Sequence, residues 1–337
     1  MTAATADPRR YRAGPVLPAH RGPLSAGVIA ALTAESAAPP GTQEAAEADP
    51  YGEDLQLSLY LLYELHYRGF AGVADHREWD PALMPLRGAL EERFLAGLRE
   101  DVPAGRSTDD VFGELLVEPA DARGSVAYHL EHEGELWQMR EYAALRSLYH
   151  LKEADPHVWV IPRLSGRAKA AMTAIEYDEF GAGRAEDVHA QLFADLMTDL
   201  GLDTRYGHYL GSAPASVLAT VNLMTLFGLH RALRGALVGH FACVEVTSPP
   251  GSRRLAQAMR RLGAGPAAVR FYDEHVEADA VHEQIVRREV TGGLLTDEPY
   301  LRDDVAFGAD ATVFLEERLA AHLLGEWRAG RSALRTA

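Results

Sequence analysis

Residues 271–289 read FYDEHVEADAVHEQIVRRE and place His275, Asp279 and His282 at positions i, i+4 and i+7. An α-helix turns by about 100° per residue, so these three side chains share a stripe about 60° wide. Two imidazoles and a carboxylate on a buried stripe are costly unless a cation binds them. The neighbouring glutamates also fit a solvated helix face. The spacing therefore predicts a helix whose polar stripe either ligates a metal or faces water.

A second cluster lies upstream, in residues 174–193, AIEYDEFGAGRAEDVHAQLF. On a continuous helix Glu179, Glu186 and His189 would fall within about 80° on one face. Glu186-x-x-His189 matches the Glu-x-x-His pattern by which helical bundles hold two iron or manganese ions. The pattern is weak alone, but the two clusters together supply six nitrogen and oxygen donors. That set suits two irons with positions left open for oxygen.

Two glycines, Gly181 and Gly183, interrupt this second ligand helix. In a helix interior each glycine lowers the stability of the helix by roughly 1 kcal/mol relative to alanine. One interpretation is a loop between two shorter helices. The other is a pliable helix that lets Glu179 reach a metal only in some states.

The rest of the chain from residue 51 onward shows a helical period. No convincing alternating strand appears, because VWVIP at 158–162 is short and is bounded by prolines. We therefore predict a single all-α domain over 49–330. Residues 1–48 are rich in Ala, Pro, Gly and Thr and predict a largely disordered arm, with a short helix near Leu24–Leu32.

The composition excludes several classes of function. The formal net charge of −16 disfavours nucleic acid and anionic membrane surfaces as partners. The single cysteine, Cys243, cannot build a thiolate metal site or an internal disulfide. No leader or membrane-spanning window appears, so we expect a cytoplasmic protein. No nicotinamide or flavin fingerprint is present either, so electrons would come from an external reductant.

Three stretches, 151–193, 233–248 and 272–283, resemble the haem-oxygenase-like di-iron oxidase and oxygenase family, often called iron-containing redox enzymes. The resemblance is close over about 145–292. It implies a haem-oxygenase-like bundle of about seven core helices, with extra N-terminal helices. It also implies ligands on three core helices: a Glu on the first, E-x6-E-x2-H on the second and H-x3-D-x2-H on the third. The last two patterns are matched at Glu179, Glu186, His189, His275, Asp279 and His282. The resemblance also favours a pliable second ligand helix over a loop at Gly181 and Gly183.

The glutamate of the first ligand helix has two candidates. Glu153 has the spacing to Glu179 that the resemblance leads us to expect, and Glu141 is its rival. A surface acid beside Lys152 is the plain alternative for Glu153.

Several further residues are candidates for supporting roles. His157, Trp159 and Arg163 follow Glu153 closely and are candidates to line a substrate pocket. His240 and Glu245 lie in an apolar run, where they fit either a buried hydrogen-bond network or support of the ligands.

The resemblance implies two Fe(II) ions per chain, O2 as co-substrate, an external electron donor and a homodimer. It favours N-oxygenation of a small amine or amino-acid-derived substrate toward a nitro or nitroso group, in specialised-metabolite biosynthesis. Oxidative C–C cleavage or decarboxylation of an amino or fatty acid is the first alternative. The second is a non-catalytic member of the fold that binds a small molecule.

Overall fold

The computed structural model describes residues 14–34, 37–117 and 122–336, and omits the side chains of residues 279 and 280. Every regular element in these ranges is a helix, so the prediction of an all-α bundle is confirmed. The α-helices are α1 (Pro23–Thr33), α2 (Thr42–Glu47), α3 (Glu53–Glu64), α4 (Met84–Asp101), α5 (Thr108–Leu115), α6 (Val126–His132), α7 (Leu136–His150), α8 (Asp155–Val158), α9 (Gly166–Glu179), α10 (His189–Asp199), α11 (Ala215–Leu229), α12 (Arg234–Leu262), α13 (Pro266–Ile285), α14 (Gly292–Asp297) and α15 (Arg302–Arg328). A π-helical segment, Val286–Thr291, joins α13 to α14.

The described part of the N-terminal arm differs from the disordered segment that its composition predicts. The short helix expected near Leu24–Leu32 is present as α1, which buries Leu24, Val28 and Leu32 and packs against α3. The Asp54 carboxylate accepts hydrogen bonds from the backbone N–H groups of Leu24 and Ser25, at 2.9 and 2.8 Å. It thereby satisfies the first turn of α1, whose own N-cap side chain is absent at Gly22. Residues 1–13 and 35–36 lie outside the described residues.

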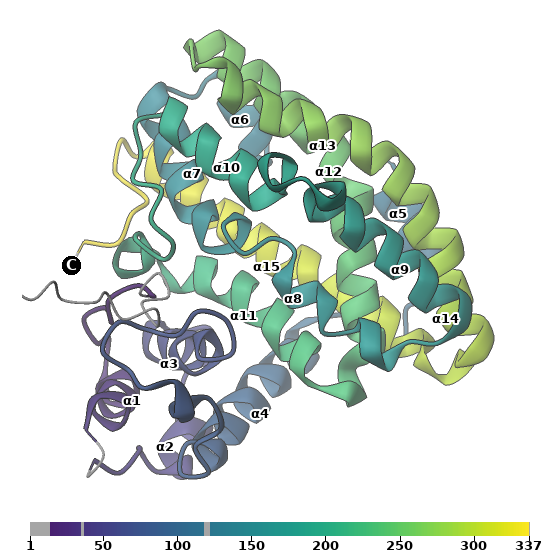
Figure 1. The fold of residues 1–337 in the computed structure, drawn as a ribbon. Coiled ribbons are helices and arrows are strands. Elements are labelled where there is room, and N and C mark those ends of the chain that lie inside the picture. The colour runs from purple at the N-terminus through teal and green to yellow at the C-terminus, as the bar shows by residue number, and fades with distance from the viewer. Residues whose placement is uncertain (1–13, 35–36, 118–121, 337) are drawn as a thin grey trace, which may run out of the picture.

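Helices α1 to α4 gather at one end of the molecule, and the remaining helices form the larger bundle (Figure 1). Helix α12 lies at the centre of this bundle, where it packs against α6, α13 and α15. It approaches α15 closely at two glycines: a Cβ atom on Gly239 or Gly308 would lie 1.9 Å from a backbone oxygen of the other helix. Helix α13 packs on its other side against α10. The ligand candidates therefore come from helices that contact one another directly.

The helix expected over 165–200 is broken. Helix α9 ends at Glu179 and α10 begins at His189, with two short 3-10 turns, Gly181–Gly183 and Ala185–Asp187, between them. Gly181 has φ 72°, and a Cβ there would lie 2.6 Å from the backbone nitrogen of Val188. Only glycine tolerates this conformation at low cost. The interpretation of a loop between two shorter helices therefore describes the structure.

No single described helix has the length and apolar composition to cross a membrane. Helices α11 and α12 meet those criteria only as a pair, with a bend of 106° between them.

Candidate metal centre

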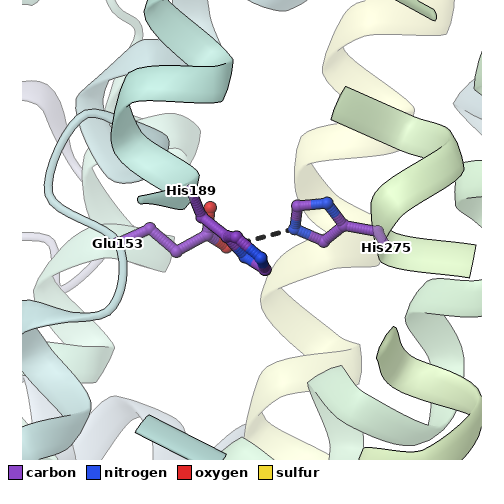
Figure 2. A group of neighbouring side chains, drawn as sticks. All are labelled: Glu153, His189 and His275. Atoms are coloured by element: carbon purple, nitrogen blue, oxygen red, sulfur yellow. Dashed lines mark ion pairs between the residues drawn. The ribbon is translucent and has the colours of Figure 1, made fainter. Parts of the chain in front are cut away.

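A first group of donors is formed by Glu153, His189 and His275, whose ligating atoms all lie within 4.8 Å of one another. Glu153 lies just before α8, His189 begins α10 and His275 projects from the middle of α13 (Figure 2). His275 Nε2 lies 3.8 Å from Glu153 Oε1, and the two imidazole rings are 4.5 Å apart between centroids. All three residues are buried. We call this group the first subsite.

Neighbouring groups set the protonation of the first subsite. His275 Nδ1 lies 2.8 Å from the backbone oxygen of Phe271, to which it donates its proton. Nε2, on the other side of the ring, faces Glu153, which is the orientation that a metal-ligating imidazole requires. Burial alone would raise the pKa of Glu153, but His150, whose Nδ1 lies 2.9 Å from Oε2, and His275 together hold it well below its usual range. Glu153 is thus kept as a carboxylate.

A second group, which we call the second subsite, is formed by Glu179, Glu245 and His282. His282 Nδ1 lies 3.5 Å from Glu179 Oε1 and 3.4 Å from Glu245 Oε2. Its Nε2 lies 3.3 Å from a carboxylate oxygen of Asp178, which accepts the Nε2 proton. Burial opposes the charged form of His282, yet Glu245, Glu179 and Asp178 raise its pKa to about 9. A cation is therefore strongly favoured here, whether a proton on the imidazole or a metal.

Glu179 belongs to both subsites. Its Oε2 lies 2.7 Å from His189 Nδ1, and its Oε1 lies 3.5 Å from His282 Nδ1. His189 Nδ1 is buried and makes no hydrogen bond in spite of this short approach. One carboxylate with an oxygen directed to each subsite is the arrangement of a bridging ligand. The two groups are therefore joined by a shared carboxylate, and each could hold one metal ion.

The donor set fits iron. Carboxylate oxygens and neutral imidazole nitrogens are the ligands of non-haem iron and manganese centres in helical bundles. Thiolate is excluded from the centre, because the single cysteine, Cys243, is packed in the core on α12. The first subsite supplies one carboxylate and two imidazoles, the second supplies a carboxylate and an imidazole, and Glu179 is shared.

Three other residues considered as ligands have different positions. Glu186 is exposed on the turn Ala185–Asp187 and joins neither subsite. Asp279 lies on α13 between His275 and His282, but its side chain is outside the described part of the structure. Glu141 lies in neither group, because its carboxylate accepts hydrogen bonds from Trp327 Nε1 and from the C-terminal segment.

Glu245 is the ligand candidate that sequence reasoning assigned only to a supporting role. It projects from α12, from within the apolar run GALVGHFACVEV at 235–246, and is buried. A lone carboxylate in such a run is the available signal, since burying it requires a partner. Its partners in the second subsite come from helices distant in sequence, which periodicity within α12 cannot identify.

His157 is at one end of a chain of hydrogen bonds that runs through His240 to Thr312 on α15. Thr312 Oγ1 donates to the Gly308 oxygen at 2.7 Å, and it accepts the proton of His240 Nδ1 at 2.8 Å. His240 Nε2 then accepts from His157 Nε2 at 3.2 Å. This order leaves His157 Nδ1 as a buried acceptor without a hydrogen bond. Burial lowers the pKa of His157 to about 4, so the ring is neutral.

Trp159 and Arg163, which follow His157 in the sequence, are half-buried, and Arg163 Nη2 donates to the backbone oxygen of Leu229 at 2.8 Å.

Comparison with known proteins agrees with this centre. A model of the iron-containing redox enzyme family matches residues 140–317, more than half of the 337-residue chain. The matched segment contains every residue of both subsites. No curated protein matches the sequence. The chain belongs to the iron-containing redox enzyme family.

Proposed function

We propose that this protein is an O2-dependent, non-haem di-iron oxygenase that oxidises the nitrogen of a small amine or amino-acid-derived substrate. The bridging position of Glu179 carries the proposal, because a carboxylate shared by two donor groups is the hallmark of a dinuclear centre. Iron, when bound, would supply the redox chemistry that activates O2. Family membership supports iron as the metal.

In this proposal each iron has its own residues. Glu153, His189 and His275 would hold the first iron, Glu245 and His282 would hold the second, and Glu179 would be a donor to both. Asp279, one turn from both histidines of α13, is proposed as an additional ligand. Glu186 is left out of this set because it is exposed on the turn before α10. His150 and Asp178 position Glu153 and His282 through the contacts described above.

The environment of the centre favours an amine as substrate. Oxidation at nitrogen requires the neutral amine, whose lone pair is available for reaction. The orphaned acceptor His157 Nδ1 is proposed to receive an N–H of the amine, which would orient its nitrogen lone pair. Glu153 and Glu179 are both close enough to influence the pKa of His157, so this acceptor belongs to the same polar interior. Trp159 and Arg163 are proposed to line the path to it.

Two further parts of the proposal come from the family resemblance. Electrons are supplied by an external cytoplasmic reductant, and the active form is a homodimer.

The test begins with anaerobic loading of the purified protein with Fe(II). We expect two irons per chain, a change in near-ultraviolet or visible absorption on exposure to O2, and substrate-dependent O2 uptake with members of an amine and amino-acid panel. With 18O2, the product should gain oxygen mass. A product that has lost a carbon fragment would instead indicate decarboxylation or C–C cleavage. Absence of any optical change in the iron-loaded protein would indicate a non-catalytic binding protein.

Two variants test the metal assignment itself. His189→Ala removes a donor of the first subsite and His282→Ala removes a donor of the second. We expect both variants to lose metal and turnover. Full activity in either variant would contradict the assignment.

A further inference from the structure

Glu176 is a buried carboxyl beside the dinuclear centre that the centre as described does not use. It lies on α9 one turn before Glu179, and at i, i+3 the two side chains point within about 60° of each other. Its relative exposure is 2%. Both of its carboxyl oxygens are buried, and neither makes a hydrogen bond with any described residue.

The charges that act on Glu176 are negative. Burial raises its pKa well above the usual range, and Glu179, Glu245, Asp155 and Glu153 raise it further, in that order. The two largest of these influences come from carboxylates of the second subsite. An arginine or lysine partner for Glu176 is not found in the described parts of the chain.

A polar group buried in this way is destabilising unless something compensates it. Apolar residues fill the rest of the inner face of α9, namely Ala168, Met172 and Ile175, so a leucine or methionine at position 176 would pack without this cost. In the metal-free protein the positive charge of the second subsite is the proton on His282. A divalent cation there would carry two charges in its place.

We propose that Glu176 is a protein ligand of the metal at the second subsite, alongside Glu179, Glu245 and His282. This assignment rests on the proposed di-iron function and deepens it. Glu176 lies outside the group of close donors formed by Glu179, Glu245 and His282, but it shares the buried face of α9 with Glu179. With a metal bound, the final turn of α9 would contribute two carboxylates.

The competing interpretation is that Glu176 is a neutral buried acid with a purely structural role. Glu176→Gln separates the two, because glutamine reproduces the shape of the neutral acid but cannot supply a carboxylate. Glu176→Asp retains the carboxylate on a shorter side chain. Glu277→Gln, at an exposed position of α13, removes the same formal charge outside the centre and serves as the control.

The experiment is an anaerobic calorimetric titration of the metal-free full-length chain with Fe(II), repeated with Co(II), whose visible absorption reports its coordination. We expect two metals in the wild type and in Glu277→Gln. In Glu176→Gln the first metal should bind as in the wild type, and the affinity for the second should fall at least tenfold. Glu176→Asp should recover part of that loss, and the Co(II) spectrum of the second site should change in both Glu176 variants.

Each other outcome overturns the assignment. If Glu176→Gln binds two metals with wild-type affinity, Glu176 is a structural acid and the di-iron function stands without it. If Glu176→Gln loses both metals, its role is in folding the centre, and circular dichroism would show whether α9 has unfolded. If the wild type itself binds a single metal, the second subsite does not exist, and the proposed di-iron function fails together with this assignment.

Discussion

Glu245 offers the sharpest test of the centre, because the structure and the family pattern select different glutamates. The structure places Glu245 in the second subsite and leaves Glu186 exposed on a turn. The substitution Glu245→Gln keeps the size of the side chain and removes its charge. Glu186→Gln makes the same chemical change at the competing position and is the matched control.

The expected magnitude follows from the contacts of His282. Its pKa is raised from 6.5 to about 9, and a hydrogen bond and the charge of Glu245 make the two largest contributions to that increase. Removing the charge should lower the pKa of His282 by at least about one unit, or about 1.4 kcal/mol. Residues that merely support a metal ligand change metal affinity by about 10- to 100-fold when substituted. Substitution of a direct ligand such as Glu245 should therefore lower the metal affinity of the second subsite by at least that factor.

Two measurements report these effects independently. In the metal-free protein, nuclear magnetic resonance of 15N-labelled histidine rings follows the titration of His282 as a function of pH. In the anaerobic protein, calorimetric titration with Fe(II) measures the number of bound metals and their affinities. Glu245→Gln should shift the titration of His282 downward and weaken the second metal, whereas Glu186→Gln should leave both unchanged.

If Glu245→Gln keeps the His282 pKa near 9 and binds two irons as tightly as the wild type, Glu245 is not a ligand of the second subsite. Loss of one iron in Glu186→Gln would show that the turn Ala185–Asp187 rearranges on metal binding and that Glu186 is a ligand after all.

Two further predictions concern stability. In the metal-free protein the raised pKa of His282 stabilises the fold fully below about pH 6.5, and this stabilisation is lost as the pH rises through about 9. The pKa of Glu176 is also raised in the folded protein, so its titration likewise lowers the stability of the fold as the pH rises. Differential scanning calorimetry should therefore show a Tm that falls over this range without metal and falls less with Fe(II); equal slopes would contradict the linkage. Separately, Lys152 Nζ lies 2.7 Å from Glu64 Oε2 in a buried ion pair, so Lys152→Met should destabilise the protein by about 3–5 kcal/mol in urea unfolding. Adding Glu64→Gln should recover part of the loss, and no recovery would show that packing, rather than the unpaired carboxylate, sets the cost.

The sequence by itself determined the helical class and the helix that carries His275 and His282. Their spacing of seven residues is about two turns, which places both side chains on one stripe about 10 Å apart along the axis. Helix geometry alone therefore predicts that they share one face, and the structure shows that this face is buried. Tertiary structure then assigns them to different subsites, His275 to the first and His282 to the second.

The arrangement of the ligand candidates in residues 174–193 could not be predicted from helix geometry. Its i, i+7, i+10 spacing places Glu179, Glu186 and His189 on one face only if the helix continues, and the chain is instead broken at Gly181. The break brings Glu179 Oε2 to 2.7 Å from His189 Nδ1 and leaves Glu186 exposed to solvent. The glycines signalled this possibility, but propensity alone could not choose between a loop and a pliable helix.

Only the tertiary structure could identify Glu176 and Glu245. Glu176 precedes Glu179 by three residues, yet the pattern that the family shares does not include it. Glu245 is a lone acid in an apolar run on a different helix. Their roles depend on which carboxylates and imidazoles meet them in the interior. Local spacing determines the face on which a side chain lies, but the charge that meets it there is set by contacts between helices distant in sequence.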